Sequence, residues 1–343
     1  MSSCTRLIWM RHSSVVLRPN PWGDPFEREV AFWLPPGYQE SSAHYPVVFY
    51  LAPFLGSGLS AGNWQPFGEN IVQRLDRLYA TGQIGPMLVV FPDAYTVLGG
   101  NQYVNSSAVG AYGDYLSLEL VPFVDAHFRT LPQKSHRGVL GKSSGAYGAL
   151  RLAMDYPTVW GAVAHHSGDA YFDVAYRHAW PETMTYLASL VAHQSETSLE
   201  AAVHLLIQSV RQASRPSSAA THALMNIAMA ATYDPDPNAE LGFQLPMEWH
   251  SGRWREERWA HWLAHDPLYR VSSFVRELQQ LRCLYLDCGN QDTYHLHYGA
   301  RQLSECLREL RVPHEYVEFV GTHSDINHRL DESFPLLYQA LKH

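Results

Sequence analysis

The sequence predicts an α/β fold in which helices cover both faces of a mostly parallel, doubly wound sheet. From residue 45 onward, candidate strands and helices alternate, as in chains built from βαβ units. The runs at 45–51 and 87–92 are continuously apolar, which is typical of strands buried on both faces. At 136–154, a short apolar strand passes through a Gly/Ser turn into a helix.

Composition narrows the class of protein before any motif is considered. The chain has 343 residues, of which 46% are hydrophobic, enough for one large domain or a domain with an insertion. The net charge is −8 and there is no basic run, so we expect no nucleic-acid partner. The chain start lacks a long apolar segment and no run of 18 apolar residues occurs, so we expect a cytoplasmic protein without a membrane partner. The oligomeric state stays open, a homodimer included.

Cysteine and histidine patterns give no reason to expect a metal or a cofactor. The four cysteines form no Cys-x-x-Cys pair and are expected to be separate reduced thiols: Cys4, Cys283, Cys288 and Cys306. Two histidine pairs could suggest metal ligands, but neither has a carboxylate at helical spacing: His165 with His166, and His295 with His297.

The first part of the chain is predicted to hold four strands and two helices. A Pro/Gly-rich link at 20–25 separates the first two strands, and loops at 52–58 and 99–106 follow the third and fourth. The strands are expected at 13–17, 28–35, 45–51 and 87–92, and the helices at 67–79 and 115–128.

The regular alternation stops between residue 170 and about residue 275. Helical segments at 184–192, 199–212 and 218–231 are interrupted there by Pro-rich and Trp-rich stretches. We interpret 170–275 as a mostly helical insertion that could cap a site, with the alternative that these helices only pad the sheet. After it, strands are expected at 282–287 and 314–320, and helices at 296–310 and 329–341.

The turn at Gly141-Lys142-Ser143-Ser144-Gly145 has the pattern G-x-S-x-G between a strand and a helix. In a nucleophile elbow, such a turn exposes the serine hydroxyl at the top of a sheet, and the glycines avoid clashes. The helix N-terminus favours negative charge developing nearby. Ser143 is therefore the candidate nucleophile, and the backbone N–H of Ser144 is a candidate oxyanion donor.

An acid and a histidine follow the serine in the order that this architecture requires. Asp292 lies in the loop after the penultimate strand, and His323 lies in the loop after the last strand. Loops at the carboxyl ends of parallel strands meet at one edge of the sheet, so the three side chains are expected to converge. His323 would act as the base and Asp292 would orient it, with Asp287 and Asp325 as rival acids.

The loop after the third strand is where a second oxyanion-hole amide is expected. Phe54 is the first choice for this N–H and Leu55 the second. The polar loop 99–106 carries Gln102 and Tyr103, which could contact a substrate or could have only a structural role.

Taken together, these stretches resemble the esterase D-like family of α/β-hydrolases. That family includes enterochelin-esterase-like enzymes, S-formylglutathione hydrolases, feruloyl esterases and mycolyltransferases. The resemblance covers nearly the whole chain except the insertion, in the segments 34–38, 50–58, 99–103, 141–149, 286–292 and 321–324.

The resemblance implies an α/β-hydrolase fold in a single domain, with Ser143, Asp292 and His323 as catalytic triad and the amides of Phe54 and Ser144 as oxyanion hole. Leu55, Gln102, Tyr103 and Tyr147 are candidate substrate contacts. Two positions depart from the family pattern. Ala146 replaces a frequent glycine, and Pro53-Phe54 replaces a pair such as His-Gly, which affects the oxyanion loop because proline lacks an N–H.

The first functional hypothesis is a serine esterase that acts on small or aryl esters through an acyl-enzyme. An acyltransferase or a thioesterase could use the same triad, and product analysis with and without acceptor alcohols would separate transfer from hydrolysis. A non-catalytic binding protein on this fold is the hypothesis from another class. Loss of a triad residue would favour it, and none is lost.

Overall fold

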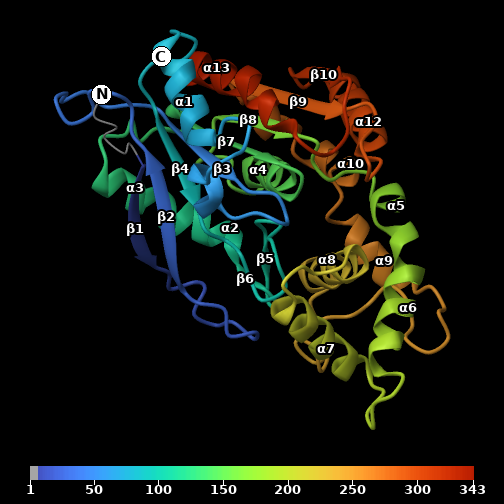
Figure 1. The fold of residues 1–343 in the computed structure, drawn as a ribbon. Coiled ribbons are helices and arrows are strands. Elements are labelled where there is room, and N and C mark those ends of the chain that lie inside the picture. Colours follow the sequence, from blue (N-terminus) through green and yellow to red (C-terminus); the bar gives the residue numbers. More distant parts are fainter. Residues whose placement is uncertain (1–6) are drawn as a thin grey trace.

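Eight strands form one mixed sheet in the computed structural model, which describes residues 7–343 (Figure 1). Their order is β1-β2-β4-β3-β7-β8-β9-β10. Strand β2 runs antiparallel to both of its neighbours, β1 and β4, and every neighbouring pair from β4 to β10 is parallel. This confirms the predicted α/β fold. The strands span Leu7–Ser13 (β1), Glu27–Trp33 (β2), Val47–Leu51 (β3), Leu88–Pro92 (β4), Arg137–Lys142 (β7), Ala162–His166 (β8), Cys283–Gly289 (β9) and Glu315–Phe319 (β10). A two-residue pair, β5 (Asn105–Ser106) and β6 (Gly110–Ala111), forms a separate small hairpin. Cys4 and the chain start lie outside the described residues.

The strand register sets the carboxyl ends of the parallel strands side by side. Leu51 at the end of β3 pairs with Gly141 of β7, and Gly141 pairs with His165 of β8. At the other side, Phe319 at the end of β10 pairs with Gly289 at the end of β9. The loops that follow these strands therefore leave the sheet at one common edge.

Two apolar cores lie on opposite faces of the sheet. Helices α1 (Ile71–Ala80) and α13 (Leu330–Leu341) bury leucine and phenylalanine side chains against one face. Helices α3 (Val121–His127), α4 (Ser144–Asp155) and α12 (Leu296–Glu309) belong to the core on the other face. The alternating side-chain directions of the buried strands supply both cores, as expected for a doubly wound sheet.

Two elements expected from the sequence, one helix and one strand, differ from the structure. The helix expected at 115–128 is one turn of α2 (Tyr112–Asp114), a π-helical stretch (Tyr115–Leu120) and α3. The strand expected at 13–17 is wrong, because the strand ends at Ser13. Residues 14–16 instead wrap around Glu119, whose carboxylate accepts the Ser14 hydroxyl and the backbone N–H groups of Val15 and Val16.

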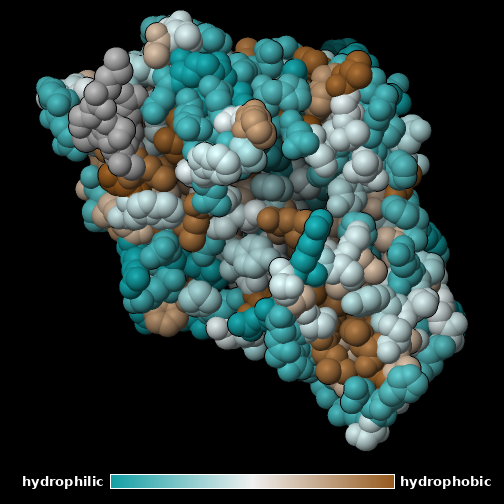
Figure 2. All heavy atoms as spheres, in the orientation of Figure 1, coloured by the Kyte–Doolittle hydropathy of each residue, from teal (hydrophilic) through white to brown (hydrophobic). Residues whose placement is uncertain are grey.

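The segment between β8 and β9 is helical and extends beyond the sheet (Figure 1). Its helices are α5 (Phe172–Ala175), α6 (Trp180–Val191), α7 (Leu199–Gln212), α8 (Ser218–Tyr233), α9 (Glu256–Leu263), α10 (Pro267–Arg270) and α11 (Val275–Gln279). Figure 2 shows a largely hydrophilic face on which apolar side chains gather where α6, α7 and α8 meet. None of the helices within residues 7–343 has the length and apolar character needed to cross a membrane.

A buried polar network fastens α13 to the two strands beneath it. His166 on β8 contacts the Asp287 carboxylate on β9 at 2.7 Å through Nδ1 and the Ser333 hydroxyl on α13 at 2.8 Å through Nε2. Arg329 donates to the other Asp287 oxygen at 2.9 Å, and the Tyr285 hydroxyl donates to the same oxygen at 3.0 Å. Burial alone would raise the pKa of Asp287, but His166 and Arg329 outweigh it and the pKa lies below its ordinary value.

We predict that Asp287→Asn lowers the free energy of unfolding by about 3 kcal/mol at pH 7, because it removes the charge partner of a buried His/Arg pair. Urea denaturation measures this value. The lowered pKa of Asp287 means that its contribution is complete above pH 3.8 and is lost as the pH falls further, so the difference should shrink only in acid. Glu332→Gln, at an exposed position of the same helix, should change stability by less than about 0.5 kcal/mol. Equal stability of Asp287→Asn and wild type at pH 7 would contradict the argument.

Candidate active site

The turn between β7 and α4 holds Ser143 in a strained backbone conformation. Its φ of 54° and ψ of −124° are rare for a residue with a Cβ. A Cβ on Gly141 would lie 2.3 Å from the carbonyl carbon of Gly145, and a Cβ on Gly145 would lie 2.1 Å from the carbonyl oxygen of Leu51. Both glycines are therefore required sterically, and the turn presents the serine at the first residue before α4.

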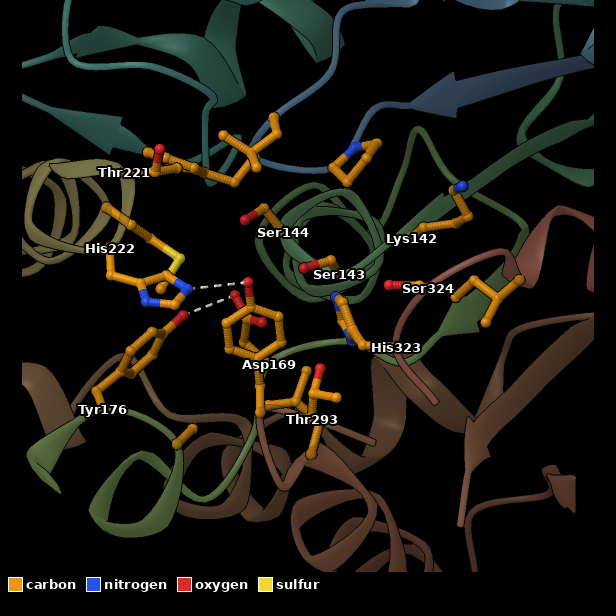
Figure 3. Close-up of a pocket in the computed structure, with 18 of the residues that line it drawn as sticks. Lys142, Ser143, Ser144, Asp169, Tyr176, Thr221, His222, Thr293, His323 and Ser324 are labelled. Carbon is orange, nitrogen blue, oxygen red and sulfur yellow. Dashed lines mark hydrogen bonds between the residues drawn. The ribbon is translucent and has the colours of Figure 1, made fainter. Parts of the chain in front are cut away.

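His323 and Asp292 meet at the same edge of the sheet, in the loops after β10 and β9. Nδ1 of His323 lies 2.7 Å from Oδ2 of Asp292. The Asp292 carboxylate is buried, and its second oxygen accepts the backbone N–H of Tyr294 at 2.9 Å. The Tyr294 ring packs edge-on against the His323 ring, with centroids 4.8 Å apart. In Figure 3 the His323 ring lies beside Ser143.

Neither rival acid is hydrogen-bonded to His323 in the described part of the chain, although Asp325 lines the same cavity as Ser143. Asp287 is fully buried and contacts His166, Arg329 and Tyr285 rather than His323. Asp325 lies on the exposed loop two residues after His323 and has a left-handed backbone, with φ of 57°. Among the described acids, Asp292 is the carboxylate that contacts His323.

The loop after β3 brings Phe54 to the site, supported by two glycines from the loop after β4. A Cβ on Gly100 would lie 2.1 Å from the carbonyl oxygen of Phe54, and one on Gly99 would lie 2.7 Å from its ring. The Phe54 backbone therefore rests directly on the Gly99-Gly100 backbone. Phe54 and Ser144 line the same cavity as Ser143 and His323.

The four expected substrate contacts fall in different places. Leu55 is 66% exposed and lines the cavity. Gln102 is buried beneath the cavity and donates through Nε2 to the Ser144 hydroxyl at 2.9 Å. Tyr103 donates its hydroxyl to the Ala52 carbonyl, and Tyr147 donates to the His265 carbonyl. The structure does not bring Gln102, Tyr103 and Tyr147 to the cavity wall; they support the loops and helices around it.

A cavity of about 400 Å³ extends from Ser143 toward the helical segment between β8 and β9. Helices α5 and α8 build one wall of it. That wall consists of Ala175, Tyr176, Thr221, His222, Met225 and Met229. The remaining wall comes from the loops at the sheet edge. Methionine and aromatic side chains make the wall formed by α5 and α8 largely apolar.

Asp169 also lines this cavity, and the sequence reasoning did not identify it. Its carboxylate accepts a hydrogen bond from the Tyr176 hydroxyl at 2.7 Å (Figure 3) and another from Gln102 Nε2 at 3.2 Å. Burial raises the pKa of Asp169 above its ordinary value, although Tyr176 and His323 oppose the shift. The signal was available: Asp169 follows β8 at the same sheet edge, which is the argument that identified Asp292 and His323.

The arrangement contains the parts needed for acyl transfer to a serine, and the described residues offer no separate metal centre. No group of three or more His, Cys, Asp or Glu side chains within residues 7–343 could hold a metal ion. His166 is bound to Asp287 and Ser333. Cys283, Cys288 and Cys306 are free thiols.

Two curated relatives of this chain are named esterases. The chain is 30% identical over 165 residues to two esterases of Mycobacterium tuberculosis, Esterase MT1326 and Esterase Rv1288. Each alignment covers 44% of this chain and 33% of the relative, so the matched part spans about a third of those proteins.

Solved structures of low sequence identity share the fold. A ferulic acid esterase matches with a TM-score of 0.62 at 16% identity, over 97% of this chain and 98% of its own. The Staphylococcus aureus serine hydrolase FphF matches with a TM-score of 0.58 at 15% identity, again over 97% and 98%. An S-formylglutathione hydrolase from S. aureus matches with a TM-score of 0.56 at 15% identity over the same shares.

The family model described as "Putative esterase" matches residues 25–330, which include the elbow, both following loops and the helical segment. The chain therefore belongs to this esterase family and has an α/β-hydrolase fold.

Proposed function

We propose that the chain is a serine esterase that works through an acyl-enzyme, with Ser143 as nucleophile, His323 as base and Asp292 as the orienting acid. The observation that carries this proposal is the strained turn that presents Ser143 to a cavity also lined by His323, whose other nitrogen is held by Asp292. Nucleophile, base and orienting group in this order are the constellation that activates a serine hydroxyl.

In the acylation step, Ser143 Oγ attacks the ester carbonyl carbon while Nε2 of His323 takes the hydroxyl proton. The negative charge that develops on the carbonyl oxygen is stabilised by the backbone N–H groups of Phe54 and Ser144 and by the N-terminus of α4. Asp292 fixes the imidazole tautomer and stabilises its charged form. The bond to the alcohol oxygen then breaks, and the alcohol leaves with the proton from His323.

Deacylation repeats these events with water. His323 removes a proton from water, the hydroxide oxygen attacks the acyl carbon, and the proton returns to Ser143 Oγ as the acid leaves. An acceptor alcohol in place of water would give transfer instead, and a thioester could acylate the same serine. Product analysis with and without acceptor alcohols distinguishes hydrolysis from transfer.

The cavity supports small or aryl esters as substrates. Its volume of about 400 Å³ is near the lower end of small-molecule sites, and one wall carries Met225, Met229 and Tyr176. Flat or flexible apolar groups pack well against methionine and aromatic side chains.

Replacing Ser143 tests the proposed nucleophile. Ser143→Ala should lower kcat for p-nitrophenyl butyrate at least about 10³-fold, because the remaining groups cannot form an acyl-enzyme. A fluorophosphonate probe should add one covalent group to the wild type, detected by mass spectrometry, and none to Ser143→Ala.

Ser144→Ala is the matched control, because it removes the neighbouring hydroxyl and keeps the backbone N–H. It should retain covalent labelling and lose less than about tenfold in kcat, the scale of one lost neutral hydrogen bond. Circular dichroism checks that both variants are folded. Full labelling of a folded Ser143→Ala would reject Ser143 as the nucleophile.

Replacing Gly100 tests whether the oxyanion loop depends on the support of this glycine. Gly100→Ala places a methyl group against the Phe54 backbone and should displace its N–H, lowering kcat by about 10²-fold with a smaller change in KM. Steady-state kinetics of p-nitrophenyl esters measure both constants. Gly82→Ala, after α1, has room for a Cβ but a φ of +72°, so it should lower stability and leave kcat of the folded protein unchanged. An unchanged kcat in Gly100→Ala would show that Phe54 does not need this support.

A further inference from the structure

A second cavity adjoins the one beside Ser143, on the side away from Asp169. Its volume is about 210 Å³, and it shares Pro53, Leu55 and Lys142 with the first cavity. The other lining residues come from the loop after β3, the segment leading into α1, and the turn after His323. They include Tyr50, Ser57, Asn70, Ile71 and Asn327.

Lys142, the residue directly before Ser143, lines both cavities and brings a positive charge to the wall that they share. In Figure 3 it lies on the opposite side of Ser143 from Asp169. Its ammonium group donates to the amide oxygen of Asn327 at 2.5 Å, and within residues 7–343 it has no carboxylate at ion-pair distance. Asp325 attracts this charge from further away and Arg74 repels it. One of three N–H donors is thus used, on a neutral partner. Asp325, which lines the first cavity, attracts the charge only from beyond ion-pair distance, and a partly buried cation without a direct ion pair is costly.

The second cavity offers further donors and no acid. None of its lining residues is Asp or Glu, although the chain has a net charge of −8. Ile71 and the capping residue Asn70 place the N-terminus of α1 at this wall, which favours negative charge. Burial keeps the pKa of Tyr50 above its ordinary value, so its hydroxyl stays a neutral donor. Asp93, which accepts a hydrogen bond from the lining residue Ser57, is also paired with Arg28.

We propose that this second cavity is a subsite for a compact anionic group, a carboxylate or a phosphate, carried by the ester substrate and bound by Lys142. The inference rests on the proposed function, since Lys142 adjoins Ser143. It adds a substrate class: esters with a negative charge close to the scissile bond. Lys142 is then a specificity-determining residue. The apolar wall formed by α5 and α8 accommodates another part of the substrate.

Matched ester pairs test the charge directly. On the acyl side, 4-nitrophenyl hydrogen glutarate is compared with its methyl ester. On the alcohol side, 3-carboxyphenyl butyrate is compared with its methyl ester. For the better anionic substrate, Lys142→Met should lower the ratio of anionic to neutral kcat/KM at least fivefold, mainly through KM. Lys134→Met, which removes a lysine remote from both cavities, should leave the ratio within twofold.

Lys142→Gln separates charge from structure. Glutamine can still donate to Asn327, so a merely structural role of Lys142 predicts a ratio like that of the wild type. The anion subsite predicts the same fall as in Lys142→Met. Because burial lowers the pKa of Lys142 to about 8, the wild-type ratio should also decline as the pH rises from 7 to 9, while that of Lys142→Gln stays flat. A fall of less than fivefold for both ester pairs in Lys142→Gln would overturn the proposal, whatever the result for Lys142→Met.

Binding to an inactive protein separates this inference from the proposed function. Calorimetric titration of Ser143→Ala with glutarate and with inorganic phosphate should show binding of one anion that weakens at least tenfold in the Ser143→Ala, Lys142→Gln double variant. The preferred anion distinguishes carboxylate from phosphate chemistry. Lys142-dependent binding without Ser143-dependent hydrolysis would uphold the subsite and reject the esterase mechanism. Ser143-dependent hydrolysis, with neither anion binding nor the ester ratio depending on Lys142, would uphold the esterase mechanism and reject the subsite.

Discussion

The geometry of the site depends on one backbone constraint, the left-handed conformation at Ser143. The turn is so tight that β7, α4 and the end of β3 approach one another through backbone atoms, and neither Gly141 nor Gly145 leaves room for a Cβ. The strain at Ser143 is held by the packing of a helix on a buried sheet. A stable core is therefore a condition for the exposed serine, rather than a separate property of the protein.

The molecule contains two arrangements of serine, histidine and aspartate, and their comparison shows what makes such a set useful. Ser333, His166 and Asp287 are joined by hydrogen bonds of ordinary length, as Asp292 and His323 are. The first set has no exposed surface and serves to hold α13 and the turn after His323 against the sheet. The second set borders a cavity. The two sets share their residue types and the His–Asp hydrogen bond, and they differ in that only the second borders a cavity.

Strand ends were the most informative part of the sequence. Apolar runs bounded by loops located the parallel strands, and the rule that their carboxyl ends meet brought Asp292 and His323 together correctly with the Ser143 turn. The same rule applied to β8 would have identified Asp169. Contacts across the fold were not predictable: Tyr103 and Tyr147 turn toward distant carbonyl groups, and residues 14–16 end a strand because Glu119, a hundred residues later, binds their backbone.

The cavity wall formed by α8 affects which parts of the protein can change in evolution. Four of its residues, Thr221, His222, Met225 and Met229, lie along one stretch of α8, whereas Ser143, Asp292 and His323 belong to loops of the sheet. Substitutions on α8 alter the shape offered to a substrate without passing through the strained turn or the buried network. If the proposed function holds, substrate range and chemical machinery are thus separately mutable at Thr221, His222 and Met225, which are only partly buried, whereas Met229 also belongs to the folded core.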